Sequence, residues 1–206
     1  MLGIYIFMLK RRTKHIIYIA VGIFIFALLY ALKNTTYFVR AAGFLFFVFL
    51  TILSDYFFRF GFKRHHYAII FVVAFLGVLL SPLYFIYPNY DKILHLIIPI
   101  LLGIVIFFLV DKLDAPLSVK LTLTFTIVVT IVSMHEVGEY ILDQIFDWKL
   151  QGVYIRDYSE IAKLKIIQGK NDDTMTDMIL STLGALIFVL AKTYIYWYKR
   201  LVSKKS

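Results

Sequence analysis

The residues best suited to chemistry are a histidine and two glutamates at the end of an apolar stretch. His135, Glu136 and Glu139 follow the apolar run Leu121–Met134. Residues three or four apart share one face of a helix, so these side chains can point the same way. Ionisable groups at the edge of a bilayer are costly unless they are paired, hydrated or bound to an ion, so the pattern indicates a functional site.

Two more polar pairs have the same spacing, Asp91 with His95 and Asp173 with Asp177. Imidazole with carboxylate suits zinc, iron or manganese, and carboxylates alone suit magnesium or calcium. Helical bundles build such sites from facing helices. We therefore expect one polar pocket formed by three helices, with a divalent metal ion (Zn, Mn or Mg) as the candidate cofactor. The predicted metal ligands are Asp91, His95, His135, Glu139, Asp173 and Asp177, and the predicted catalytic residues are Glu136, Glu139 and Asp177.

Each pair also has a structural interpretation. Asp91 beside Lys92 is typical of a salt-bridged helix start, and Asp172 suits the positive end of a helix dipole as a peripheral cap. Asp177 differs because it lies against an unbroken apolar run, and its expected partner is His95 or Glu139. A structural network that pins the helices together therefore stays open beside a functional pocket.

Composition places the chain among membrane proteins. Of its 206 residues, 61% are hydrophobic and the mean hydropathy is +0.82, whereas soluble domains are about 45–50% apolar. The chain has no cysteine, which excludes disulfides, thiolate metal sites and cysteine nucleophiles.

The apolar runs predict an all-α polytopic protein, a bundle of six transmembrane helices forming a single domain over residues 1–206. Runs near 18 residues or more suit membrane helices. The first run follows a basic cluster without a small-x-small cleavage site, so we expect an uncleaved anchor. The expected spans are Ile16–Leu32, Phe38–Ser54, Tyr67–Tyr87, Asp91–Val110, Leu121–Glu139 and Met178–Tyr198. Pro82 is expected to kink the third span or to end its regular part.

The charge distribution predicts the orientation. With both termini in the cytoplasm, cytoplasmic segments hold 14 of the 22 Lys and Arg, and outer segments hold ten of the 13 acids. This agrees with the positive-inside rule. The net charge of +9 then needs no nucleic acid to explain it, and we expect membrane lipids as partners in a multi-pass protein of the cell membrane. The three polar pairs fall on the extracytoplasmic side.

The one long connection, Trp148–Lys170, lies between the fifth and sixth spans. Its apolar residues recur at helical spacing, which predicts a short amphipathic helix over Tyr158–Gln168 lying on the membrane. This partly helical extracytoplasmic connection would act as a lid over the polar cluster. Its basic residues could bind a phosphate, and the predicted substrate-binding residues are Arg156 and Lys170.

Several motifs together resemble a known family. They are Tyr90-Asp91-Lys92-x-x-His95, Glu136-x-x-Glu139 and Asp173-Thr174-x-x-Asp177-Met178, followed by Gly184-Ala185. Their order resembles the YjdF-like family of small membrane proteins and, more distantly, VanZ-like proteins. The chain departs from the family at Tyr140, where a Trp is usual, and at His135, which is not a family feature. The resemblance covers Tyr90–Ala185 and implies an architecture, a shared polar site and a role in the cell envelope.

Three classes of function remain open. One is a metal-dependent membrane enzyme acting on a lipid or lipid-linked headgroup. Another is a transporter of ions or protons, which acidic pairs would suit. The third is a non-catalytic scaffold or binding protein. The acids are concentrated in the last three expected spans, whereas many transporters carry matching features in two inverted repeats.

Overall fold

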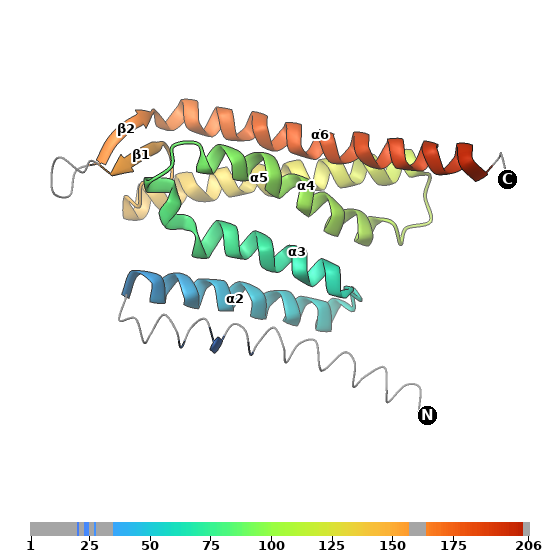
Figure 1. Ribbon diagram of the computed structural model, residues 1–206, viewed down its shortest axis with the longest axis horizontal. Coiled ribbons are helices and arrows are strands. Elements are labelled where there is room, and N and C mark those ends of the chain that lie inside the picture. The colour runs from blue at the N-terminus through green and yellow to red at the C-terminus, as the bar shows by residue number, and fades with distance from the viewer. Residues whose placement is uncertain (1–19, 21–22, 25–26, 28–34, 157–163, 204–206) are drawn as a thin grey trace. The chain divides into compact units, whose positions relative to one another are not determined.

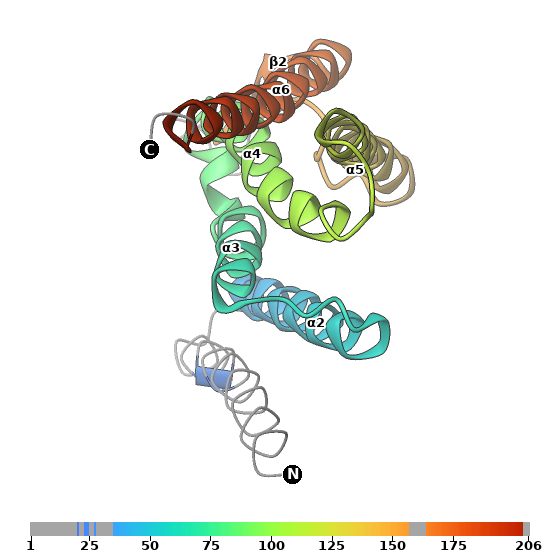
Figure 2. The same ribbon diagram turned by 90° about the vertical axis from the view of Figure 1, so that its right-hand side faces the viewer.

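The computed structural model describes residues 20, 23–24, 27, 35–156 and 164–203. It confirms an all-α membrane protein, with one short hairpin added. The chain forms two compact units, Met1–Ser81 and Pro82–Ser206, each considered by itself (Figures 1 and 2). The elements are α2 (Thr35–Phe58), α3 (Arg64–Ala74), a π-helix (Phe75–Leu79), a 3-10 helix (Ser81–Phe85), α4 (Tyr90–Val110), α5 (Leu117–Phe146), β1 (Val153–Arg156), β2 (Leu164–Gln168) and α6 (Lys170–Ser203).

In the first unit α2 packs against α3 and the π-helix. Phe44 of α2 is fully buried and meets Phe71 of α3 edge to face, with ring centroids 5.1 Å apart. The turn between the two helices is held by Asp55, whose buried carboxylate accepts hydrogen bonds from the backbone N–H of Gly61 at 2.7 Å and from the Tyr67 hydroxyl. A buried carboxylate needs such partners, so Asp55 has a structural explanation.

The third predicted span, Tyr67–Tyr87, is not one continuous helix. Pro82 has no N–H to donate to the carbonyl four residues earlier, and that carbonyl, of Val78, instead accepts a hydrogen bond from the Ser81 hydroxyl at 2.7 Å. The chain passes from α-helix to π-helix to 3-10 helix across this break. The apolar helical part, Arg64–Leu79, is shorter than a membrane span.

The prediction of six spans is therefore wrong for the part of the chain that the structure describes. Four helical segments there are long and apolar enough to cross a membrane: Arg40–Phe58, Tyr90–Val110, Leu117–Phe146 and Lys170–Ser203. The predicted first span, Ile16–Leu32, lies almost entirely outside the described residues.

In the second unit α4, α5 and α6 lie lengthwise against one another, as the end-on view of Figure 2 shows. Two glycines bring α4 and α6 close together. The Phe188 ring lies over Gly103, where an added Cβ would be 2.5 Å from it, and a Cβ on Gly184 would collide with the carbonyl oxygen of Leu96. Glycine permits such close approach because it has no side chain.

The connection between α5 and α6 is a β-hairpin in its described residues, so the predicted amphipathic helix is wrong. β1 pairs antiparallel with β2, with Ile155 opposite Lys165 and Tyr154 opposite Ile166. β-branched residues favour strands, and Gly152, at φ 91°, supplies the left-handed turn that begins the hairpin. Residues 157–163 of the predicted helix lie outside the described residues.

Candidate functional site

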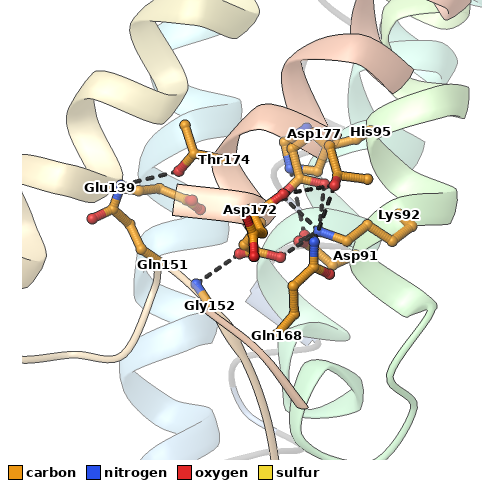
Figure 3. Close-up of polar contacts among 12 residues, drawn as sticks. Asp91, Lys92, His95, Glu139, Gln151, Gly152, Gln168, Asp172, Thr174 and Asp177 are labelled. Atoms are coloured by element: carbon orange, nitrogen blue, oxygen red, sulfur yellow. Dashed lines mark hydrogen bonds and ion pairs between the residues drawn. The ribbon is translucent and has the colours of Figure 1, made fainter. Parts of the chain in front are cut away.

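Lys92 joins α4 to α6 through the acids of α6. Its ammonium lies 2.8 and 2.9 Å from the two carboxylate oxygens of Asp177, contacts Asp173 as well, and is 3.7 Å from Asp91. Figure 3 shows Lys92 directed at this group of carboxylates. Asp177 is only 1% exposed, so its charge is compensated inside the protein. Lys92, Asp173 and Asp177 therefore form one half of the cluster, an ion-pair network that joins α4 to α6 and is explained by a structural role.

His95 lies where α4 meets both α5 and α6. Its Nε2 is 3.5 Å from Asp91 and 3.6 Å from Oε1 of Glu136 on α5. Its Nδ1 is 3.1 Å from the hydroxyl of Ser181 on α6. The imidazole therefore presents one nitrogen to the acids and the other to a hydroxyl.

Glu136 has a different environment from Asp177. It is 4% exposed, and neither of its carboxylate oxygens has a hydrogen-bond partner among the described residues. Two imidazoles lie beside it, His95 at 3.6 Å and His135 at 3.8 Å. A buried carboxylate without hydrogen bonds is strongly unfavourable, so the geometry is that of a group that takes a further partner.

His135 is the exposed member of the cluster. Its side chain is 58% exposed, and its Nδ1 is 3.8 Å from both Glu136 and Glu139. The His135 and His95 rings meet edge to face, with centroids 5.9 Å apart. His135 was predicted as a metal ligand although it is not a feature of the family that the motifs resemble, and the structure places it beside Glu136.

Among the residues that the structure describes, two groups of three side chains could each hold a metal ion, with ligand atoms within 4.8 Å of one another. They are His95, His135 and Glu136, and Asp91, His95 and Asp177. The ammonium of Lys92 already donates hydrogen bonds to both carboxylate oxygens of Asp177. A metal ion bound to Asp177 would be repelled by this positive charge. In the described part of the chain, no lysine or arginine pairs with Glu136, whose ionic contacts are to His95 and His135. The first group is therefore the better candidate site.

The predicted substrate-binding lysine has another partner. Lys170 lies 3.0 Å from Asp143, whose fully buried carboxylate also accepts hydrogen bonds from the backbone N–H of Leu150 at 2.7 Å and of Gln151 at 3.2 Å. Asp143 thus fixes the start of the connection to α5 and α6. The other predicted residue, Arg156, lies exposed at the end of β1.

The start of the connection lies against the cluster. The backbone N–H of Gly152 donates to Asp173 at 2.7 Å, and the side-chain amide of Gln151 donates to Thr174 at 3.1 Å (Figure 3). From β2, the side-chain amide of Gln168 donates to Thr176 of α6 at 3.0 Å. The described part of the connection therefore contacts the start of α6 beside the cluster, and its role as a lid stays a prediction.

Tyr84 is a neighbour of the cluster that sequence reasoning missed. It lies in the 3-10 helix outside the four candidate spans, with its ring 5.2 Å from that of Tyr90. Burial raises the pKa of the Tyr84 hydroxyl well above its usual range, and the negative charges of Asp91 and Glu139 raise it further. Tyr84 therefore keeps its proton in the folded protein.

The cluster lies near one end of the three-helix unit. At the other end Lys120 pairs with Asp111 at 3.0 Å, and Lys192 lies over the Phe107 ring at 4.2 Å. At 1.5 Å per residue, Lys192 is roughly 22 Å along α6 from Asp177, a large part of the ~30 Å hydrocarbon thickness. The acids therefore lie near one membrane boundary and these lysines near the other.

Fold and site together define an α-helical membrane protein with a buried His/Asp/Glu cluster near one end of its spans. The chain belongs to a family of predicted membrane proteins, DUF2238, whose model matches residues 13–198. Comparison with curated proteins and with solved structures gave no match.

Proposed function

We propose that this membrane protein binds a divalent transition-metal ion through His95, His135 and Glu136, and that the ion serves an enzyme acting on lipid or lipid-linked headgroups. The observation that carries the proposal is Glu136, a buried carboxylate beside two imidazoles. Its oxygens have no hydrogen-bond partner within the described part of the chain. Two histidines and one carboxylate form a known donor set for catalytic zinc, with a fourth position left for water or substrate.

The distances support such a site. Tetrahedral zinc bound at about 2.0–2.2 Å holds its ligand atoms roughly 3.3–3.6 Å apart. Oε1 of Glu136 is 3.6 Å from Nε2 of His95 and 3.8 Å from Nδ1 of His135. Side-chain movements of a few tenths of an ångström would bring these two pairs to the tetrahedral spacing, and all three candidate ligand atoms lie within 4.8 Å of one another.

The reaction class follows from the position and the neighbours of the site. Glu139, 3.8 Å from His135, is placed to remove a proton from a water molecule. The water oxygen bonds to phosphorus, the bond from phosphorus to the leaving oxygen breaks, and that oxygen takes the proton. A site near a membrane boundary is within reach of headgroups. The extracytoplasmic location, the cell-envelope role and the closer kinship with YjdF-like or VanZ-like proteins belong to the same proposal.

Zinc binding by the full-length protein in nanodiscs tests the metal site. We expect one zinc per chain, with affinity lowered by at least about tenfold in Glu136→Gln, because the amide is a poor metal ligand. Asp172→Asn, which changes an exposed acid of α6, should bind as the unchanged protein does. Absence of zinc binding, or equal binding by Glu136→Gln, would overturn the proposal.

The stability of the metal-free protein should respond in opposite directions to changes in the candidate metal site and in the ion-pair network of Lys92 and Asp177. Glu136→Gln should raise the melting temperature, because it removes a buried charge without hydrogen bonds. Asp177→Asn should lower it, because it leaves the Lys92 ammonium without its buried partner. A lower melting temperature for Glu136→Gln would favour the structural network as the role of the whole cluster.

The lipid part has its own test. Zinc-loaded protein in vesicles of phosphatidylethanolamine and phosphatidylglycerol should release headgroups, and Glu139→Gln should reduce the rate by about 10²–10⁴-fold, as expected for loss of a general base. Zinc binding without headgroup release would leave the metal site in place and reject phospholipid headgroups as substrates.

A further inference from the structure

Ser181 is fully buried on α6 and directed at His95. It is 1% exposed, and its hydroxyl lies 3.1 Å from Nδ1 of the imidazole. A buried hydroxyl on an apolar membrane helix has few partners available, and the usual one is a carbonyl one turn earlier. The neighbouring Thr182 does this, donating to the Met178 carbonyl at 2.7 Å. Ser181 instead lies against a side chain of another helix.

The packing of α6 on α4 fixes this contact in space. Asp177 meets Lys92 one turn before Ser181 meets His95. One turn further along, Gly184 meets the Leu96 carbonyl closely enough that a Cβ would collide with it. Residues 177, 181 and 184 share one face of α6 by spacing. The contacts of Asp177 with Lys92 and of Gly184 with Leu96 therefore fix the position of α6 along α4, and with it the position of the Ser181 hydroxyl beside His95.

We infer that Ser181 is a positioning residue for the metal site: with an ion bound at Nε2 of His95, on the side of Asp91 and Glu136, the Ser181 hydroxyl accepts a hydrogen bond from Nδ1–H and fixes the orientation of the ring. This inference rests on the proposed metal site. A metal-ligating histidine usually donates its other ring N–H to an oxygen acceptor, which fixes both the tautomer and the ring orientation. α6, which supplies no ligand to the site, then controls its geometry.

The nitrogen through which His95 binds zinc supplies a direct test. In histidine ¹⁵N NMR spectra of the zinc-loaded full-length protein, His95 should bind zinc through Nε2 and carry its proton on Nδ1. Ser181→Ala should convert this single form into a mixture of Nε2-bound and Nδ1-bound imidazole, and Ser181→Thr should retain it because the hydroxyl is kept. Thr182→Ala is the matched control, because its hydroxyl bonds within α6. A His95 bound to zinc through Nδ1 in the unchanged protein, or a Ser181→Ala spectrum equal to that of the unchanged protein, would overturn the inference.

Zinc affinity then separates the positioning role from the metal site itself. Ser181→Ala should weaken zinc binding by about 10–100-fold, the usual cost of losing such a partner, and should alter the visible spectrum of bound Co²⁺. Ser181→Thr and Thr182→Ala should stay near the unchanged protein. Normal zinc affinity in Ser181→Ala would reject Ser181 alone, whereas failure of the unchanged protein to bind zinc would reject the metal site. If Ser181→Ala fails to fold, Ser181→Val is compared with Ser181→Thr instead. Ser181→Val should then lose zinc affinity and the single Nδ1-protonated form of His95, and Ser181→Thr should retain both.

Discussion

At the scale of single residues, Glu136 and Asp177 show that two buried acids of one cluster can have opposite roles. Asp177 is compensated by Lys92 at 2.8 Å, whereas Glu136 has no hydrogen-bond partner among the described residues. Their sequence contexts are alike, since each lies beside an apolar run. The three-dimensional neighbours, and not the residue types, therefore separate the structural half of the cluster from the candidate metal site.

The alkaline stability of the protein is expected to depend on Tyr84. Its pKa is raised in the folded state by burial and by nearby carboxylates, so the unfolded chain loses this proton first as the pH rises above about 10. Stability should therefore fall with rising pH in that range. Tyr84→Phe should show a shallower fall in melting temperature between about pH 9 and 11. Identical profiles for the two proteins would contradict burial of the hydroxyl.

Sequence spacing predicted many residues of the cluster but missed the neighbouring residues that hold them in position. Repeats of three and four residues were enough to bring Asp91, His95 and Glu136 to one place. Ser181 carried a usable signal, because it follows Asp177 by four residues on the same helix face. Asp143 and Tyr84 carried none, because their contacts depend on how the chain returns after α5 and before α4.

At the scale of elements, the close approach of α4 and α6 depends on Gly184. Its Cβ would collide with the Leu96 carbonyl oxygen, a backbone atom that cannot rotate away. Gly184→Ala should therefore destabilise the protein by about 1–3 kcal/mol, as overpacking does, and should weaken zinc binding by shifting Ser181 away from His95.

Gly138 of α5 is the matched control for this substitution. A Cβ there meets nothing within 4 Å, so Gly138→Ala should be neutral or stabilising by up to about 1 kcal/mol. Thermal unfolding of both variants in the same detergent provides the comparison. Equal effects at the two glycines would show that the helix spacing does not depend on Gly184.

Two element-level predictions were wrong for local reasons. The third predicted span was counted from hydropathy, which does not register the carbonyl that Pro82 leaves without its helical partner. The connection after α5 has apolar residues at both helical and alternating spacings, and short apolar runs cannot separate helix from strand by periodicity alone. The left-handed turn at Gly152 favoured the hairpin.

At the scale of the whole molecule, the two ends of the second unit differ in charge. Among its described residues, acids outnumber basic residues at the end that holds the cluster, and basic residues outnumber acids at the other end. The cluster of Asp, Glu and His lies near one end, and Lys120 and Lys192 lie near the other. This polarity agrees with the positive-inside rule if the lysine end is cytoplasmic. The proposed site would then face the cell exterior or periplasm.

Reporter fusions check this orientation. A fusion after Asp114, in the turn between α4 and α5, should report the cytoplasm, and a fusion after Gly152, before the hairpin, should report the opposite side. Charge reversal at the lysine end should reduce this preference. The reversed pattern would place the metal site on the cytoplasmic side and remove the argument for outer-leaflet headgroups.

The most direct measurement of the central claim is the zinc X-ray absorption spectrum of the zinc-loaded full-length protein. A site built from His95, His135 and Glu136 should give nitrogen and oxygen neighbours at about 2.0–2.2 Å, with outer-shell scattering from two imidazoles. His135→Ala should remove one imidazole contribution, and Asp91→Asn should leave both. A spectrum with only oxygen neighbours, or one that His135→Ala does not change, would contradict a metal site at these three residues.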